Sequence, residues 1–155
     1  MAKTVAASLA ILGASLAVAQ PAMAVNWYSR SNPLHGYESD KTFGLVYGNF
    51  YNYNSTYANS TTYQYDSQAD GHDVRAETDY YFWETGTGCD PGASCWRQDT
   101  SKQSAETSSA AWVKDNRSEP LHGGASGARG GVNLCEIIAW HNDPCSVHAW
   151  PSFSY

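Results

Sequence analysis

Side chains alternate between two sets along the segment from His72 to Glu84. In an extended chain, five mostly apolar residues would point to one side and five charged or aromatic residues to the other. The first set is Val74, Ala76, Thr78, Tyr80 and Phe82, and the second is Arg75, Glu77, Asp79, Tyr81 and Trp83. A period of two is typical of an antiparallel strand with one buried face. We therefore predict a half-buried strand over this segment.

Two further segments show a weaker alternation. Phe43, Leu45 and Tyr47 are predicted to share one face of a strand. Tyr63 and Tyr65 are predicted to share one face of another. Between them lies an uncharged tract of Tyr, Asn, Ser and Thr, which fits either a polar loop or a hydrogen-bonded edge strand.

The C-terminal third contains two more predicted strands and a flexible link. Residues 98–113 mix helix formers with Ser and Thr and end on Ala-Ala-Trp-Val, and we interpret them as a strand. The glycine-rich residues 123–131 lack the Lys-Ser/Thr of a phosphate-binding loop and are predicted to form a mobile connection. Residues 132–140 are strongly hydrophobic, which indicates a central strand. After a turn at residues 142–144, residues 145–155 are expected to pair with it as a final strand.

The N-terminus has the three parts of a cleavable secretory signal. Lys3 is followed by an apolar run, residues 5–18, and by the small-residue sequence A-M-A that ends at Ala24. We predict a signal peptide over residues 1–24 and a mature chain that is secreted and extracellular. A retained membrane anchor is the alternative, but the apolar run is shorter than the roughly 18 residues that a spanning helix needs. After cleavage, no membrane partner is expected.

The mature chain is predicted to be one small all-β domain with an arm. Residues 25–41 contain a Pro, a Gly and no sustained hydrophobic period, which favours an extended N-terminal arm. Residues 42–155 carry short predicted strands and no convincing long helix, and they are numerous enough for a single hydrophobic core. This pattern favours a disulfide-stapled β-sandwich over residues 42–155.

Two disulfides are expected, because an even number of cysteines in an exported chain is typical of an oxidising compartment. The cysteines are Cys89, Cys95, Cys135 and Cys145. Three pairings exist in principle; we favour the first with the second and the third with the fourth, since each intervening loop contains turn formers. A four-thiolate zinc site is the competing interpretation, but paired C-x-x-C spacing is missing from the sequence.

The balance of charge excludes two classes of partner. Without its predicted signal, the chain keeps 8 Lys and Arg against 15 Asp and Glu, a net charge near −7. Such a chain repels nucleic acid and acidic membrane surfaces, because phosphate binding needs clustered cations. No nucleic-acid partner is therefore expected.

Residues 66–77 nearly match the loop D-x-[DN]-x-[DN]-G-x5-E that binds calcium between two helices. Asp66, Asp70 and Glu77 occupy ligand positions of this loop, and Gly71 stands in register. Against the match, an Asp stands where an aliphatic residue is usual, and both flanks are predicted strands. We favour a polar hairpin loop with its turn at Asp70-Gly71. Calcium held by Asp66, Asp70 and Glu77 is the alternative, and no other cofactor is expected.

No catalytic set emerges from the sequence. The five histidines are scattered, with neither H-E-x-x-H nor H-x-H spacing, and a G-x-S-x-G motif is missing. Glu77 and Asp79 would share one face of the predicted strand as a carboxylate pair of the kind that glycosidases use. Outward-facing acidic residues on a half-exposed strand are the ordinary explanation. We therefore predict a protein that is not an enzyme.

The 11 Tyr, 6 Trp and 4 Phe supply rigid contact surface of the kind found in protein interfaces and sugar-binding sites. Tyr81 and Trp83 lie on the strand face opposite the predicted core, where we expect them to be exposed or covered by a partner. Trp27 and Tyr28 lie in the arm, and a partner groove that accepts the arm as an added strand would cover them. The main functional prediction is binding of other secreted proteins. The alternative is a lectin-like domain that binds a glycan through exposed Tyr and Trp.

The sequence CEIIAWHNDPCS, residues 135–146, resembles a pattern of small secreted actinobacterial proteins that end in a disulfide-closed hairpin. Among these, the chain is most similar to the adaptor subunit of umbrella toxin particles, in export, size, two disulfides, all-β pattern and N-terminal arm. In those particles, a short protein links a lectin-bearing subunit to a large scaffold subunit. The resemblance implies a linking role in an extracellular toxin assembly, in which the arm of residues 25–41 inserts into one partner and the domain binds another.

Overall fold

The computed structural model describes residues 24–86 and 88–155, and in these ranges every regular element is a β-strand. The predicted signal peptide lies outside the described residues except for Ala24. No helix in the described ranges is long and apolar enough to cross a membrane. The strands are β1 (Ala24–Trp27), β2 (Leu34–Glu38), β3 (Lys41–Tyr53), β4 (Tyr57–Asp66), β5 (Asp73–Thr85), β6 (Ser94–Gln103), β7 (Val113–Pro120), β8 (Gly127–Ile137) and β9 (Ser152–Ser154).

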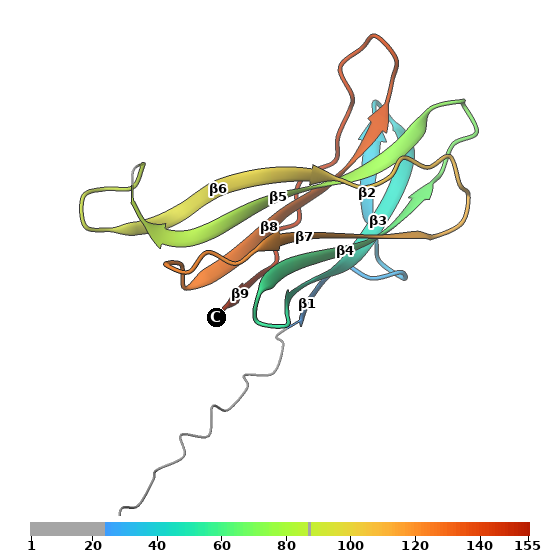
Figure 1. Cartoon of the computed structure of the whole chain (residues 1–155). Coiled ribbons are helices and arrows are strands. Elements are labelled where there is room, and N and C mark those ends of the chain that lie inside the picture. Colours follow the sequence, from blue (N-terminus) through green and yellow to red (C-terminus); the bar gives the residue numbers. More distant parts are fainter. Residues whose placement is uncertain (1–23, 87) are drawn as a thin grey trace, which may run out of the picture.

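The strands form two antiparallel sheets that pack face to face (Figure 1). In the first sheet, β1 and β2 both pair with one edge of β3, and β4 and β7 follow in order. In the second sheet, the order is β6, β5, β8 and β9. The two disulfides have the predicted pairing, Cys89 with Cys95 and Cys135 with Cys145. The prediction of a disulfide-stapled, all-β sandwich is confirmed.

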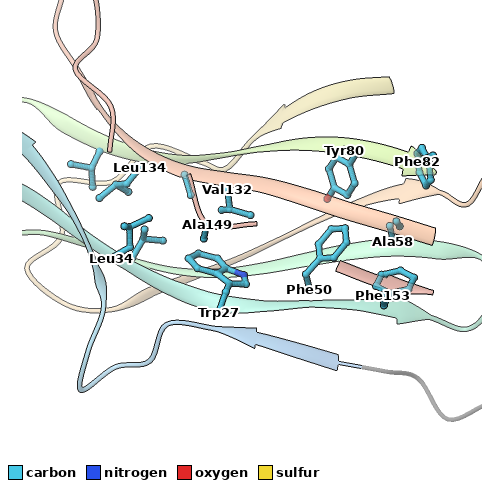
Figure 2. Close-up of a cluster of buried hydrophobic side chains, with 14 of the residues drawn as sticks. Trp27, Leu34, Phe50, Ala58, Tyr80, Phe82, Val132, Leu134, Ala149 and Phe153 are labelled. Carbon is cyan, nitrogen blue, oxygen red and sulfur yellow. The ribbon is translucent and has the colours of Figure 1, made fainter. Parts of the chain in front are cut away.

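The core lies between the two sheets (Figure 2). On β5, all five residues predicted to face inward are buried, whereas the five opposite residues are partly or largely exposed. From the facing sheet, Phe50 of β3 packs against Tyr80, with ring centroids 5.9 Å apart. Because buried aromatic rings remove a large apolar area from water, these contacts favour the packing of one sheet on the other.

The predicted common face of Phe43, Leu45 and Tyr47 is wrong. Phe43 is fully buried, while Leu45 and Tyr47 lie half-buried on the outer side of the first sheet. The pairing of β2 with β3 shifts register here and leaves Phe43 without an opposite residue, as in a β-bulge. The bulge turns the Phe43 ring inward against Gly36, where a Cβ would come within 2.2 Å of the ring. Position 36 therefore has room for glycine, and a larger residue there would require the Phe43 ring to move.

Residues 25–41 are extended, but the prediction that they form a free arm is wrong. β1 and β2 continue one another along the edge of β3, so their backbone groups are hydrogen-bonded within the sheet. Trp27 is only 5% exposed and points into the core beside Val132 and Ala149 (Figure 2). An unpaired arm would leave backbone donors and a large apolar ring in water, and pairing with β3 removes both costs.

The glycine-rich residues 123–131 do not form a mobile connection, because their second half begins the central strand β8. Gly130 faces the core, where a Cβ would meet the Phe50 ring at 3.1 Å. Gly131 faces outward, where a Cβ would meet the Trp150 ring at 2.7 Å. The missing side chains leave room for an aromatic ring on each face of the sheet.

Other boundaries also differ from the prediction. The uncharged tract forms the β3–β4 hairpin, and β4 lies inside the sheet between β3 and β7. Residues 98–113 contain the end of β6 and an irregular segment before β7. The regular part of the final strand is Ser152–Ser154, although Cys145 and Ala149 each form a single bridge to β8. Much of the C-terminal part therefore follows β8 without forming a regular strand.

A buried glutamine joins the two sheets where the chain crosses between them. The side-chain oxygen of Gln64, on β4, accepts hydrogen bonds from the Ala76 backbone N–H (2.9 Å) and the Ser104 hydroxyl (2.7 Å). Its side-chain nitrogen donates to the Ala105 carbonyl (2.6 Å). Gln64 is fully buried, and its partners belong to β5 and to the segment that leaves β6. One side chain therefore satisfies polar groups from both layers.

Replacing Gln64 with Leu is expected to lower the free energy of unfolding by about 1–3 kcal/mol, because polar groups around a buried position lose their partner. Urea unfolding measures the change. Gln98→Leu is the matched control, since Gln98 lies exposed on β6. Equal losses in the two variants would contradict a specific role for the buried hydrogen bonds.

Candidate functional site

Exposed aromatic side chains gather on the outer side of the second sheet. Tyr81 and Trp83 of β5 both lie there, as the alternation of that strand predicts. With Trp96 of β6, Arg129 of β8 and Trp150, they form a surface that we call the aromatic face. Trp83 is 38% exposed and Trp150 is 49% exposed, so much of this surface is open to a partner.

Arg129 lies at the centre of the aromatic face. Its guanidinium carbon is 4.7 Å from the ring centroid of Trp96, 4.9 Å from that of Trp150 and 5.2 Å from that of Tyr81. These distances are within the range of cation–π attraction. Trp83 also meets Trp96 edge to face, with centroids 5.4 Å apart. These contacts hold the rings in a fixed arrangement, and a preorganised surface is one that can bind a ligand at a low entropic cost.

A groove of about 420 Å³ lies between the β1–β2 edge and the chain that follows the second disulfide. Tyr37 is 56% exposed and Val147 is 71% exposed on its walls, and Tyr28 is exposed as well. Exposed apolar side chains around a concave surface are typical of a site that a partner covers. We call this site the edge groove; its lining residues are Tyr28, Pro33, Leu34, His35, Tyr37, Cys145, Ser146 and Val147.

The edge of the first sheet forms one wall of the edge groove. Residues 28–33 leave the edge of β3 between β1 and β2, and two backbone hydrogen bonds between Ser29 and Asn32 (3.2 and 3.0 Å) close this excursion. Tyr28 begins it with a φ of +53°, in the left-handed region that non-glycine residues rarely adopt. The excursion moves the Tyr28 side chain out of the sheet and onto the groove.

Residues 145–151, which we call the C-terminal segment, form the other wall. The second disulfide and backbone hydrogen bonds from the N–H groups of Ser146 and Ala149 (2.8 Å each) attach this segment to β8. Val147 lies on the edge groove and Trp150 on the aromatic face. The same attachment therefore positions both surfaces.

The loop between β8 and the C-terminal segment presents a tryptophan to solvent. Trp140 is 100% exposed and has a φ of +67°. The Asp143 carboxylate braces the loop, because it accepts the Ile138 N–H (3.1 Å) and pairs with Arg75 (3.4 Å). The loop rises beside the β2–β3 hairpin (Figure 1). An exposed indole on a braced loop is well suited to anchor a protein partner.

Of the four aromatic residues predicted to bind a partner, Trp27 is in the wrong place. Its indole is part of the core, so a partner cannot reach it in the folded protein. Its neighbour Tyr28 is exposed on the edge groove, and Tyr81 and Trp83 are on the aromatic face. Partner binding by these three residues stays a prediction.

The structure does not bring the predicted calcium ligands together. Asp66 is buried in the sandwich, and Glu77 lies on the outer side of β5, where an arginine and a glutamine hold its carboxylate. Asp70 is instead grouped with His72 and Glu136, and one ligand atom of each lies within 4.8 Å of the other two. Among the described residues, this is the group of acidic, His and Cys side chains compact enough for a metal.

Two carboxyl groups are buried near the β4–β5 connection. Burial raises the pKa of Asp66 above its ordinary value, the Gln68 backbone N–H partly opposes this, and the charges of Asp70 and Asp73 raise it further. Burial likewise raises the pKa of Glu136. At this end of the sandwich, burial therefore makes the charged forms of both carboxyl groups less favourable than they are in water.

Comparison with protein-family models, curated proteins and solved structures finds no match for the chain. The function of the chain therefore has to be inferred from its own surfaces. These are the aromatic face, the edge groove and Trp140. Sequence reasoning had proposed Tyr28, Tyr81 and Trp83 for partner binding, and the folded chain leaves all three at least partly exposed. Trp140 and Val147 were missed, because each was placed in a predicted strand and only the fold leaves them outside the sheet.

Asp66→Asn is expected to raise the free energy of unfolding at pH 7. The raised pKa of Asp66 means that folding binds a proton, so this group favours the fold below its ordinary pKa of about 3.9. That contribution is lost as the pH rises through the folded-state pKa. The advantage of the variant should therefore be largest at neutral pH and shrink toward pH 4.

Urea unfolding at several pH values checks this expectation. Asp40→Asn is the control, since Asp40 is exposed in the β2–β3 turn. A variant at Asp66 that is less stable than the natural chain at pH 7 would contradict the burial cost.

Proposed function

We propose that this chain is a secreted, non-enzymatic adaptor that binds a protein partner in the edge groove. The proposal rests on one observation: the exposed side chains of Tyr28, Tyr37 and Val147 line a concave space of about 420 Å³. Tyr supplies a large contact area at low entropic cost, and interfaces are enriched in it. A cavity of this size accepts side chains of a partner.

The chemistry of the partner follows from the lining and the charge of this region. Tyr28, Tyr37 and Val147 offer apolar contact, while the exposed Glu38 follows Tyr37 along the chain. The chain as a whole is acidic. The matching partner is a protein segment with an apolar or aromatic side chain, and a basic partner is favoured by the acidic net charge of the chain, because opposite charges speed association.

An adaptor needs a second surface, and the aromatic face supplies it. Its residues belong to β5, β6, β8 and Trp150, whereas the edge groove is built by the first sheet and residues 145–147. Two partners can therefore be held by different elements of one chain. This agrees with the linking role that the resemblance of residues 135–146 implies. Because β1 and β2 pair with β3, the version of this role that we propose has the partner come to the groove at this edge, in place of an arm that inserts into the partner.

Secretion is part of the proposal. The basic residue, apolar run and A-M-A sequence that end at Ala24 have the order of a cleavable signal. Two disulfides in a small domain are compatible with an extracellular protein. Assembly with other secreted proteins, including those of a toxin complex, fits this compartment.

A second candidate function is carbohydrate binding at the aromatic face. Trp83 and Trp150 expose parts of their rings, and sugar rings stack on such surfaces. Asp79 and His148, 3.8 Å apart at the border of the face, supply polar groups for hydroxyls. This candidate places the ligand away from the edge groove.

Tyr37→Ser is expected to weaken capture of the protein partner by roughly tenfold or more, because truncation of an anchoring aromatic commonly costs about 2 kcal/mol. The tagged protein is recovered from its own culture medium, and the co-purified protein is identified and quantified by mass spectrometry. Tyr53→Ser is the matched control, since Tyr53 is an exposed tyrosine outside the groove. Equal losses in both variants, or recovery of the natural chain only as a free monomer, would count against the adaptor.

A glycan array tests the second candidate. If the aromatic face binds sugar, Trp150→Ala and Trp83→Ala each abolish the signal of the natural chain, because they remove the stacking surface. Tyr57→Ala serves as the control, since Tyr57 is exposed on β4 of the other sheet. Lack of any glycan signal from the natural chain would rule this candidate out.

A further inference from the structure

Three metal-ligand side chains from two distant segments meet near the β4–β5 connection. The chain bends at Gly71, which has a φ of +88°, and the His72 backbone N–H donates to a carboxylate oxygen of Asp70 (3.0 Å). This bend brings the Asp70 carboxylate within 4.0 Å of His72 Nδ1. Because β5 pairs with β8, Glu136 also reaches this point, and its Oε1 lies 3.6 Å from His72 Nδ1.

Glu136 is the member of this group that points to a bound cation. Its side chain is only 3% exposed, and its buried Oε2 has no hydrogen-bond partner among the described residues. The ion pair of Glu136 in this part of the chain is with His72, while Glu38 and Asp70 add negative charge nearby. Buried charges in proteins are generally paired or coordinate metals, because an unpartnered carboxylate oxygen is costly to bury. Oε2 is therefore a buried acceptor that has no donor among the described residues.

We propose that Asp70, His72 and Glu136 bind a divalent transition-metal ion, for which zinc is the best fit. Zinc takes imidazole nitrogen and carboxylate oxygen together, whereas calcium takes oxygen ligands. In a tetrahedral site with bonds of about 2.0–2.1 Å, ligand atoms lie about 3.3 Å apart. In the structure, His72 Nδ1 lies 4.0 Å from the Asp70 oxygen and 3.6 Å from the Glu136 oxygen, and all three ligand atoms lie within 4.8 Å of one another, so the group would contract around a bound ion. Three protein ligands leave the fourth position to water.

The zinc site differs from the calcium loop that the sequence suggested. Asp70 belongs to both sets, but Asp66 and Glu77 are replaced by His72 and Glu136, and the imidazole changes the class of metal. A bound ion joins the β4–β5 connection, where the chain crosses between the sheets, to β8. Zinc is therefore expected to stabilise the sandwich.

Titration calorimetry of the exported protein with zinc chloride tests the site. The natural chain is expected to bind one zinc ion, and its melting temperature is expected to rise with zinc and not with calcium chloride. His72→Gln and Glu136→Gln should each weaken zinc binding by at least about tenfold, because even changes behind the direct ligands of a metal commonly cost this much. His141→Gln is the matched control, since His141 is an exposed histidine outside the group. It should bind zinc as the natural chain does.

Failure of the natural chain to bind zinc overturns the proposal, as does unchanged zinc binding by His72→Gln. Equal responses to calcium and zinc also overturn it, because they indicate a site made of oxygen ligands alone. Melting curves without metal show whether each variant is folded. If His72→Gln does not fold, Glu136→Gln decides the question, since it keeps the shape of the buried side chain and removes its charge.

Discussion

The attachment of the C-terminal segment to β8 is the interaction on which both proposed binding surfaces depend. This segment forms few regular strand pairs, yet the second disulfide and the backbone hydrogen bonds of Ser146 and Ala149 hold it against the central strand. Val147 is thereby placed on the edge groove and Trp150 on the aromatic face. Gly131 leaves room for Trp150 on the aromatic face, because a side chain at position 131 would occupy the space of the Trp150 ring. One short irregular segment thus contributes a side chain to each of the two exposed surfaces of the sandwich.

The two surfaces use their aromatic residues differently. On the aromatic face, Arg129 fills the space between rings and holds them in a fixed arrangement, so little order has to be created on binding. In the edge groove, Tyr28 and Tyr37 stand on the interrupted outer edge of the first sheet. Exposed sheet edges invite pairing with other chains, and an interruption between β1 and β2 limits such pairing while it opens a concave site. The fold therefore favours recognition through side chains over addition of a strand.

Local pattern was enough to predict the features whose causes are local. The alternation of β5 decides which side chains face the core, and the turn formers between neighbouring cysteines decide their pairing. Trp27 and Phe43 were misplaced, because their burial depends on pairing with β3 and on a bulge that alternation does not record. Glu136 reaches Asp70 and His72 only once β5 lies beside β8, so no spacing along the chain predicts that group. Sequence reasoning accordingly identified the class of fold and part of the aromatic surface, whereas the edge groove and the proposed metal ligands required the folded chain.

Hydrogen exchange tests the central claim most directly, because it reports which backbone segments a partner covers. The exported chain is compared alone and in the complex recovered from its own medium. If the chain is an adaptor, binding of the protein partner slows exchange in residues 33–37 and 145–147, which include most of the residues that line the edge groove. Unchanged exchange in both segments, with protection confined to other parts of the sandwich, would contradict binding at the edge groove.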